Sequence, residues 1–377
     1  MLRSSFLCNS KKWNLLQRLV HSEAITYTEH GDPEQVLRFS STPVHPFAND
    51  EVLVKVHAAP INPSDINTIQ GTYPIKPKLP AVAGNEGAGK IIACGKNVDG
   101  FSVGDTVIPL ELASGTWQTY WCGKADSFLK IKHPIPISYA ATLAINPSTA
   151  LHLLNNFVEL QKGDILIQNG ATSAVGIYVI QIAKILGFNT GESFIYFYQL
   201  ILTLPSYFMC LVNLFRERDT PEATEETRNL LKSYGGTWCL TESEYMERAK
   251  ELGPFKLALN CLGGKPASIL VKNLSHSGTM VTYGGMTRNP MPLPVGPFIF
   301  KDISLRGFWL SNFNLHQSTS KRQLTIDQLS KWFSENLIRP SPFEEIPFKE
   351  WRKALHMSLF SDSAPTSIRK KSVLIME

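Results

Sequence analysis

A stretch with the residue types of a nucleotide-binding turn runs from Ile165 to Gly176 and reads ILIQNGATSAVG. Its apolar start predicts a short buried strand, and the small residues 170–174 predict a tight turn before a helix. Small residues let the backbone approach a pyrophosphate, whose charge is stabilised by the free amides and the dipole of the helix N-terminus. Because Ala174 stands where glycine is commoner, the stretch fits both a dinucleotide site and an ordinary strand-to-helix turn.

Arg216, Glu217 and Arg218 follow the apolar run VNLF, which has the pattern of a second strand. In a dinucleotide-binding unit this strand ends about 20 residues after the glycine turn, in the group that reads the adenosine ribose. An acidic residue suits NAD there, whereas guanidinium groups suit the 2′-phosphate of NADP. The two arginines indicate NADP, although Arg216 comes 46 residues after Gly170.

The excess length lies in residues 191–211, most of which belong to a run of 22 uncharged residues, 194–215. Without these 21 residues the interval falls to 25, and the helix end GFNT runs directly into VNLFRER. The apolar run is long enough to span a bilayer, which takes roughly 20 residues. A span within one strand–helix–strand crossover would divide the domain across the membrane, so the pattern disfavours an anchor.

The remaining interpretations of this insert are a packed native insertion, an isoform-specific insertion, and a translated intron or gene-model error. Gly191-Glu192-Ser193 can be encoded as GGTGAGTCN, which contains a splice-donor consensus, and 21 residues keep the reading frame open. We favour the intron or gene-model error, a hypothesis that transcript reads carrying the segment in essentially every mRNA would contradict. If translated, the insert is expected beside the adenosine pocket, where it would weaken NADPH binding.

The net charge of +5 is concentrated at the N-terminus. Residues 1–22 hold four basic residues and no acid, so the rest of the chain carries only +1. This composition, with hydroxyl residues and no continuous apolar core, is typical of a mitochondrial presequence, and a solvated N-terminal helix is the alternative. The net charge of +1 on residues 23–377 indicates no clustered basic surface of the kind that binds nucleic acid.

The six cysteines are scattered without a C-x-x-C pair, which argues against a disulfide framework or a zinc knuckle and fits a reducing compartment. Upstream of residue 146 the chain has short strands among Gly and Pro, including EVLVKVHAAP (51–60), where Val52, Val54 and Val56 alternate. From there the sequence pattern is that of alternating strands and helices, as in an α/β domain.

Several further stretches together resemble one family, the mitochondrial trans-2-enoyl-CoA reductases of the medium-chain dehydrogenase/reductase superfamily. They are INPSDIN (61–67), QGTY (70–73), LPAVAGNEGAG (80–89), GDTVIP (104–109), INPSTA (145–150), NCLGG (260–264), TMVTYGGM (279–286) and FKDISLRGFWLS (300–311). The resemblance covers about residues 23–377, apart from the insert.

This resemblance implies an α/β fold with a GroES-like β-rich catalytic domain and a Rossmann dinucleotide-binding domain. The expected division is a presequence (1–22), the first part of the catalytic domain (23–145), the Rossmann domain (146–317) interrupted by the insert (191–211), and a return to the catalytic domain (318–377). NADPH would donate a hydride to C3 of a 2-enoyl thioester on CoA or acyl carrier protein. A homodimer in the mitochondrial matrix is also implied.

By the same resemblance, Tyr73 is the proton donor to C2, a role that a phenol can perform as a general acid. Without the family, an aromatic cap on a Pro-rich loop would be the better interpretation. The residues matching cofactor-binding and cleft positions are Asn146, Thr172, Ser173, Ala174, Val175, Arg216, Glu217, Arg218, Tyr283, Gly284, Gly285, Met286, Phe308, Trp309, Leu310, Ser311 and Lys371. Trp309 also fits an ordinary core position.

No metal is expected, because zinc-dependent relatives carry Cys and His where this chain has Pro63-Ser64-Asp65 and Asn85-Glu86. A quinone or alkenal reductase of the same superfamily is the rival activity, and a non-catalytic isoform disabled by the insert is the rival of another class. The sequence leaves open the acyl length, the choice between CoA and acyl carrier protein, and the presequence cleavage point.

Overall fold

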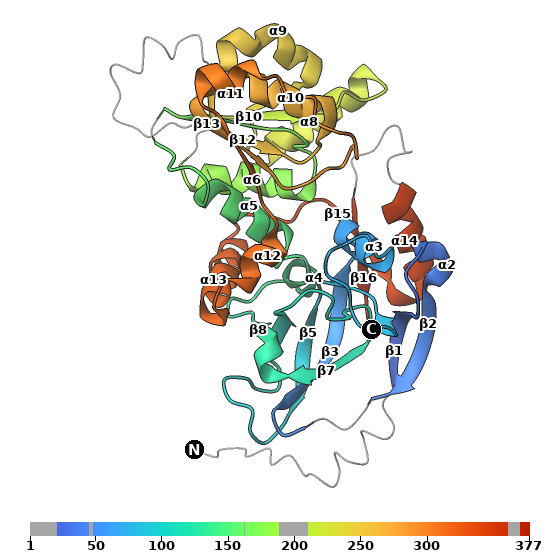
Figure 1. The fold of residues 1–377 in the computed structure, drawn as a ribbon. Helices are drawn as coiled ribbons and strands as arrows, with labels where there is room; N and C mark the ends of the chain where they lie inside the picture. Colours follow the sequence, from blue (N-terminus) through green and yellow to red (C-terminus); the bar gives the residue numbers. More distant parts are fainter. Residues whose placement is uncertain (1–20, 45–47, 162, 188–209, 361–369) are drawn as a thin grey trace.

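The chain folds into two domains, each built on its own β-sheet system, in a computed structural model that describes residues 21–44, 48–161, 163–187, 210–360 and 370–377. In Figure 1 the catalytic domain is the lower half and the parallel-sheet domain the upper half, with the helices α5, α6, α12 and α13 between them. The α/β class predicted from the sequence is confirmed.

Two mainly antiparallel sheets make up the catalytic domain. The larger has the order β15-β16-β3-β5-β6-β8, with β7 also paired to β3, and the smaller has the order β2-β1-β4. Their strands are β1 (His21–Tyr27), β2 (Arg38–Pro43), β3 (Glu51–Pro60), β4 (Ala81–Val82), β5 (Ala88–Cys94), β6 (Thr106–Pro109), β7 (Tyr120–Lys124), β8 (Phe128–Lys130), β15 (Phe343–Pro347) and β16 (Lys371–Ile375). The C-terminal strand β16 thus returns to lie beside β3 (Figure 1).

Strand β3 is buried on both faces and is the centre of the larger sheet. The alternating residues Val52, Val54 and Val56 are buried, and Leu53 on the opposite face is only 1% exposed. Leu53 packs against Val44 and Ala93 in a small second core. The alternating pattern had suggested one buried face, and the second layer covers the other.

The N-terminal boundary of the folded domain lies before the predicted one. His21 and Ser22, which the sequence placed in the presequence, begin β1 and pair with Pro43 and Thr42. The Ser22 hydroxyl donates to the backbone oxygen of Tyr120 at 3.0 Å. Removal of a presequence up to residue 22 would therefore shorten a strand. The presequence itself otherwise lies outside the described residues.

The second domain is a six-stranded parallel sheet of order β11-β10-β9-β12-β13-β14. Its strands are β9 (Ile165–Gln168), β10 (Cys210–Phe215), β11 (Trp238–Thr241), β12 (Phe255–Asn260), β13 (Leu274–Thr282) and β14 (Ser304–Gly307). The strand order reverses between β9 and β12, the point at which open parallel sheets bind their ligands. This is the doubly wound arrangement expected of a Rossmann domain.

Helices flank this sheet and the seam between the domains. Those of the parallel-sheet domain are α6 (Ala174–Ile185), α8 (Pro221–Ser233), α9 (Glu242–Leu252), α10 (Gly264–Lys272) and α11 (Gly296–Lys301). The others are α2 (Pro33–Val36), α3 (Pro63–Ile69), α4 (Ile137–Ala141), α5 (Asn146–Asn155), α12 (Leu310–Leu315), α13 (Thr319–Ser334) and α14 (Trp351–Phe360), with short 3-10 turns at Ala125–Ser127 and Phe348–Glu350.

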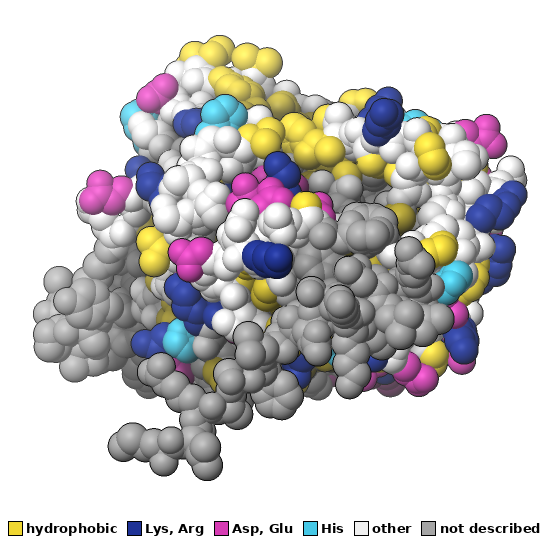
Figure 2. All heavy atoms as spheres, turned by 90° about the horizontal axis from the view of Figure 1, so that it is seen from below, with side chains coloured by type: hydrophobic (Ala, Val, Ile, Leu, Met, Phe, Trp, Pro, Cys, Tyr) yellow, Lys and Arg dark blue, Asp and Glu magenta, His cyan; other side chains and the backbone are white. Residues whose placement is uncertain are grey.

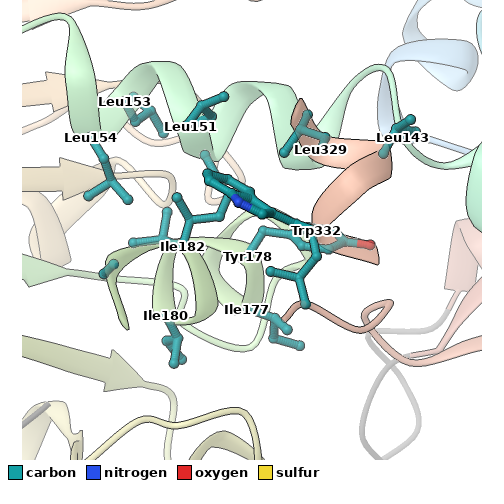
Figure 3. Close-up of a cluster of buried hydrophobic side chains, with 14 of the residues drawn as sticks. Leu143, Leu151, Leu153, Leu154, Ile177, Tyr178, Ile180, Ile182, Leu329 and Trp332 are labelled. Atoms are coloured by element: carbon teal, nitrogen blue, oxygen red, sulfur yellow. The ribbon is translucent and has the colours of Figure 1, made fainter. Parts of the chain in front are cut away.

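The seam is held by a shared apolar core and two glutamine bridges. Figure 3 shows side chains of α5, α6 and α13 gathered around Trp332, with Tyr178 and Leu329 among them. Gln323 on α13 donates to the backbone oxygen of Lys130 at 2.7 Å and accepts from its amide at 3.1 Å. Gln181 on α6 makes the same pair of bonds with the backbone of Arg339. Helix α13 therefore contacts both domains. The chain re-enters the catalytic domain at strand β15, which pairs with β16.

The end of the predicted insert belongs to the sheet. Cys210 and Leu211 lie in β10 and pair with Ile165 and Leu166, and Leu211 is fully buried. The insert therefore ends two residues earlier than predicted, because these residues continue the strand ladder. Residues 188–209 lie outside the described part of the chain.

The place where the insert attaches also differs from the prediction. The described residues that flank it are Gly187, just after α6, and Cys210, the first residue of β10. These points are at the amino-terminal edge of the parallel sheet, whereas Arg216 follows the carboxyl end of β10. Six strand residues separate the two edges, a distance of about 20 Å. The attachment points are thus on the other side of the sheet from the expected adenosine pocket.

Charged side chains of both signs are interspersed on the face shown in Figure 2, where described residues are visible, and the Lys and Arg side chains form no single basic patch there. Among the helices of the described ranges, none has the length and apolar character needed to cross a membrane. Of the apolar run 194–215, on which the anchor hypothesis rests, residues 194–209 lie outside these ranges and residues 210–215 form strand β10.

Candidate active site

A cleft of about 860 Å³ opens between the two domains and gathers most of the predicted site residues. Both domains, the seam helices and the C-terminal strand contribute to its lining. The predicted residues that line it are Tyr73, Asn146, Thr172, Ser173, Ala174, Val175, Tyr283, Gly284, Gly285, Met286, Phe308, Trp309, Leu310, Ser311 and Lys371. Arg216, Glu217 and Arg218 do not line it.

The glycine turn after β9 forms one wall of the cleft. Gly170 has a φ of +62°, and a Cβ atom there would lie 2.6 Å from the Cys261 sulfur. A Cβ atom on Gly176 would lie 2.7 Å from the Ala171 carbonyl oxygen, so the helix packs tightly onto the turn. Ser173 caps α6 by accepting from the Gly176 amide at 3.1 Å. The positive end of α6 therefore faces the cleft, as an anion site requires.

Arg216 to Arg218 follow β10, the strand next to β9, at the same carboxyl edge of the sheet. Arg218 is held by two bonds to α8: its Nε donates to Thr227 at 3.2 Å and its amide to Thr224 at 3.0 Å. Arg216 and Glu217 are exposed. Partial burial and the Arg216 charge lower the pKa of Arg218. An anion bound between the two guanidinium groups would reduce their electrostatic repulsion.

Tyr73 lines the cleft together with two residues at the start of α12. The Trp309 Nε1 donates to the Tyr73 Oη at 2.7 Å, and their rings meet edge to face with centroids 5.8 Å apart. The Ser311 hydroxyl lies 3.5 Å from the same Oη. Because the Trp309 indole can only donate, it binds a lone pair of the phenol oxygen. The phenolic hydrogen therefore remains available for donation to another group.

A buried polar cluster lies behind the cleft, at the position where zinc-dependent relatives were expected to hold metal. The Asn62 Nδ2 donates to Glu86 at 3.0 Å, and the Asn62 Oδ1 accepts from Lys371 and, at 3.4 Å, from Asn146. Asp65 accepts from the backbone amides of Asn62 and Asn85 at 2.7 and 2.8 Å. Within the described residues, no group of three or more His, Cys, Asp or Glu side chains could hold a metal ion.

Burial determines the acid strength of the two carboxyl groups in this cluster. Burial raises the pKa of Asp65 to about 7, against the opposing effect of its two amide bonds. Burial also raises the pKa of Glu86, and the Lys371 ammonium and the Ile145 amide oppose that rise. The direct neighbours of both carboxyl groups are hydrogen-bond donors, which favour the ionised form and oppose the effect of burial.

An aromatic cluster, of which the sequence indicated only Phe308, also lines the cleft. The His152 ring on α5 contacts the Phe313 ring at a tilt of 49° with centroids 4.6 Å apart, and its centroid lies 6.3 Å from that of Phe308. Burial lowers the pKa of His152 to about 4, so the imidazole is neutral at neutral pH. Together with Leu310 and Ile326, these rings give one end of the cleft an apolar lining suited to a hydrocarbon chain.

Family comparisons place each domain. The family "Alcohol dehydrogenase GroES-like domain" matches residues 48–133, and the family "Zinc-binding dehydrogenase" matches residues 222–329. The curated protein "Enoyl-[acyl-carrier-protein] reductase, mitochondrial" of Caenorhabditis elegans is 39% identical over 365 residues, covering 96% of this chain and 97% of its own length. The chain belongs to the mitochondrial enoyl-[acyl-carrier-protein] reductase family. The sequence resemblance is thereby confirmed.

Members of the family from other kingdoms and solved structures agree with this assignment. The Arabidopsis thaliana protein of the same name is 41% identical, with 90% of this chain and 85% of its own covered. The Etr1p complex with NADP and crotonyl-CoA superposes with a TM-score of 0.81 at 32% identity, over 95% of this chain and 100% of that one. A putative NADPH:quinone reductase from Bacillus thuringiensis, 24% identical with a TM-score of 0.77, shares the fold.

Sequence reasoning missed the inner residues of the family's cleft. Asn62 was noticed only as part of INPSDIN, and Glu86 only as part of GNEG and as a residue at a lost zinc position, although polar residues in apolar surroundings indicate buried hydrogen bonding. His152 lies on the same face of α5 as Asn146 and Thr149, at intervals of three residues. That polar stripe on an otherwise apolar helix was a readable signal.

Proposed function

We propose that this protein is a mitochondrial NADPH-dependent reductase of the C2=C3 double bond of trans-2-enoyl thioesters. The observation that carries the proposal is the Tyr73 hydroxyl, which Trp309 orients in the cleft that the glycine turn also lines. Membership of a family named as mitochondrial enoyl-[acyl-carrier-protein] reductases supports both the reaction and the compartment. The solved relative Etr1p, with NADP and crotonyl-CoA, supports the cofactor and the thioester.

The residues present fit NADPH. Gly170 and Gly176 leave no room for a Cβ atom, which is the close packing that a pyrophosphate-binding turn needs. Residues 172–175 would receive the pyrophosphate, and Arg216 and Arg218 the 2′-phosphate. Asn146, the segment 283–286 and Lys371 would border the nicotinamide end. When bound, NADPH supplies the hydride that adds to C3 of the substrate.

The protein's own part in the reaction is to hold the thioester and deliver a proton. Hydride addition at C3 places negative charge on C2 and the thioester oxygen, and a proton at C2 completes the reduction. We assign this proton to the Tyr73 Oη, because Trp309 already fills its acceptor position and directs its hydrogen away. The apolar end with His152, Phe308 and Phe313 would hold the acyl chain and exclude water.

The test of this function is NADPH oxidation with trans-2-hexenoyl-CoA, measured on the full chain and on the same chain without residues 191–209, a deletion that keeps strand β10 intact. We expect turnover from at least the shortened chain, because β9, α6 and β10 keep their sheet register in the presence of the insert. Turnover by both would make the insert a tolerated feature. Turnover by the shortened chain alone would identify the insert as a lesion.

Two results would overturn the proposed function. NADPH binding without any reduction of hexenoyl-CoA, but with reduction of a free quinone, would assign the chain to the rival activity. Absence of NADPH binding by the full chain, with binding restored by the deletion, would favour a non-catalytic isoform. A comparison of the hexenoyl group on CoA and on acyl carrier protein then identifies the preferred carrier.

We propose that the protein is a homodimer joined along strand β14. This strand is the edge of the parallel sheet, and an unpaired edge can add a strand from another chain. Beside it on the surface, Val295, Ile299 and Phe300 at α11 are 68, 67 and 79% exposed. An apolar patch next to a free edge is typical of a subunit interface. A heterodimer of the Candida tropicalis relatives Etr1p and Etr2p shows that proteins of this family can pair.

Light scattering after size exclusion tests the dimer. We expect twice the monomer mass of 42.0 kDa for the full chain and a single monomer mass for Phe300→Asp, because the charge would be buried at the interface. Met246→Asp is the matched control, since Met246 is an exposed apolar residue (54%) on α9. A monomeric parent protein, or equal masses for the two variants, would contradict this interface.

A further inference from the structure

The amide of Asn62 is fixed between a group that only accepts and a group that only donates. Its Nδ2 donates to the Glu86 carboxyl at 3.0 Å, and its Oδ1 accepts from the Lys371 ammonium. An ammonium has no acceptor, and an ionised carboxylate has no donor. Asn62 is only 3% exposed, so water offers it no alternative partner. These contacts permit one orientation of the amide and not the flipped one.

The fixed amide of Asn62 in turn sets the orientation of the Asn146 side-chain amide. The Asn146 Nδ2 donates to the Asn62 Oδ1 at 3.4 Å, which turns the Asn146 Oδ1 away from Asn62. Asn146 is the first residue of α5 and lines the cleft. Its oxygen is then available in the cleft as an acceptor, which suits the amide hydrogens of a carboxamide ligand.

Glu86 reaches Asn146 by a second route through the backbone. The other carboxyl oxygen of Glu86 accepts from the amide of Ile145 at 2.9 Å. Ile145 directly precedes Asn146, so one buried side chain fixes both the position of the main chain and the direction of the side-chain amide. Asp65, the other buried carboxyl of the cluster, bonds only the amides of Asn62 and Asn85 and does not touch Asn146.

We propose that Glu86 is a positioning residue that, through Asn62, sets the Asn146 carboxamide to receive the nicotinamide carboxamide of NADPH. The proposal rests on the proposed function, in which Asn146 borders the nicotinamide end of the cofactor. Glu86→Gln keeps the size of the side chain but places a donor where both neighbours also donate. The Gln amide must then break one bond or reverse Asn62, and reversal of Asn62 would present the Asn146 nitrogen to the cofactor.

The experiment compares the affinity of the full-length variants for NADPH and for 2′,5′-ADP, which lacks the nicotinamide. We expect Glu86→Gln to weaken NADPH binding about tenfold, the cost of one mispaired buried hydrogen bond, and to leave 2′,5′-ADP binding unchanged. Asn146→Ala should show the same selectivity, and the double variant should be no weaker than Asn146→Ala alone. Asp105→Asn, the loss of a carboxyl that pairs with Lys130 at 2.6 Å and does not line the cleft, should change neither affinity.

Other outcomes overturn the inference. Equal weakening of NADPH and 2′,5′-ADP, or unchanged NADPH affinity with a lowered melting temperature, would make Glu86 a structural residue only. Additive losses in the double variant would show that Glu86 does not act through Asn146. If Glu86→Gln does not fold, Asn62→Ala removes the same relay and is judged by the same criteria. Binding is read without turnover, so failure of the parent protein to reduce hexenoyl-CoA would count against the proposed function and not against this inference.

Discussion

Replacement of Tyr73 by Phe is expected to lower kcat for hexenoyl-CoA reduction by about 10²- to 10⁴-fold, the usual contribution of a general acid. Phe retains the ring that meets Trp309 edge to face at 5.8 Å, so the wall of the cleft should keep its shape. It removes the Oη atom that accepts from Trp309 and that we assign to proton delivery. Steady-state NADPH oxidation, with NADPH affinity measured separately, checks this prediction.

The affinity for NADPH should be nearly unchanged in Tyr73→Phe, because the described hydrogen-bond partners of the Tyr73 Oη are Trp309 and Ser311 and not the residues proposed to hold the cofactor. Tyr139→Phe is the matched control: Tyr139 packs on Phe333 and Phe343, away from the cleft, and its variant should retain full activity. A Tyr73→Phe enzyme that keeps kcat within tenfold of the parent would remove Tyr73 from proton delivery. A loss confined to KM would make it a substrate-binding residue instead.

Replacement of both Arg216 and Arg218 by Ala is expected to raise KM for NADPH by about 100-fold while KM for NADH changes little. Each guanidinium can make a charge-assisted bond to the 2′-phosphate worth about 1.5–3 kcal/mol, and 1.4 kcal/mol is about tenfold in affinity. NADH has no phosphate at that position, so it loses nothing. Initial rates over a range of both cofactors at saturating hexenoyl-CoA give the two constants.

Arg248→Ala serves as control for the loss of positive charge. Arg248 lies on α9 over the Trp238 ring, at 4.8 Å, and makes an exposed ion pair with Glu251, so its removal should leave both KM values unchanged. The two single variants separate the roles of the pair, because Arg218 is tied to Thr227 while Arg216 is exposed. Equal increases of KM for NADPH and NADH would contradict a phosphate-reading role for these arginines.

Local sequence features were enough to predict the strand, turn and helix at the glycine turn. The apolar run, the small residues and the helical spacing all act over fewer than 20 residues, so they can be recognised without knowledge of the fold. The sequence predicted less well the features that depend on residues distant in the chain. Strand β2 was not predicted, and β3 was expected to bury one face although both are covered. Its second layer comes from Val44 and Ala93, which only the fold brings there.

The sheet topology corrects the expectation that the insert lies beside the adenosine pocket. Arg216 comes soon after the insert in sequence, and this closeness suggested that the insert would border the adenosine pocket. In a parallel sheet, however, the residues before a strand and the residues after it lie at opposite edges. Strand β10 therefore keeps the attachment point at Cys210 away from the arginine.

The sequence by itself determined the fold class and predicted 15 site residues that line the cleft, because each depends on a short pattern or on a family motif. Only the tertiary structure decided how these residues meet. Tyr73 and Trp309 are 236 positions apart and Asn62 and Lys371 are 309 apart, yet each pair shares a hydrogen bond. Such contacts carry no periodic signal in the chain, since they form only when two separately folded domains and the C-terminal strand close around one cleft.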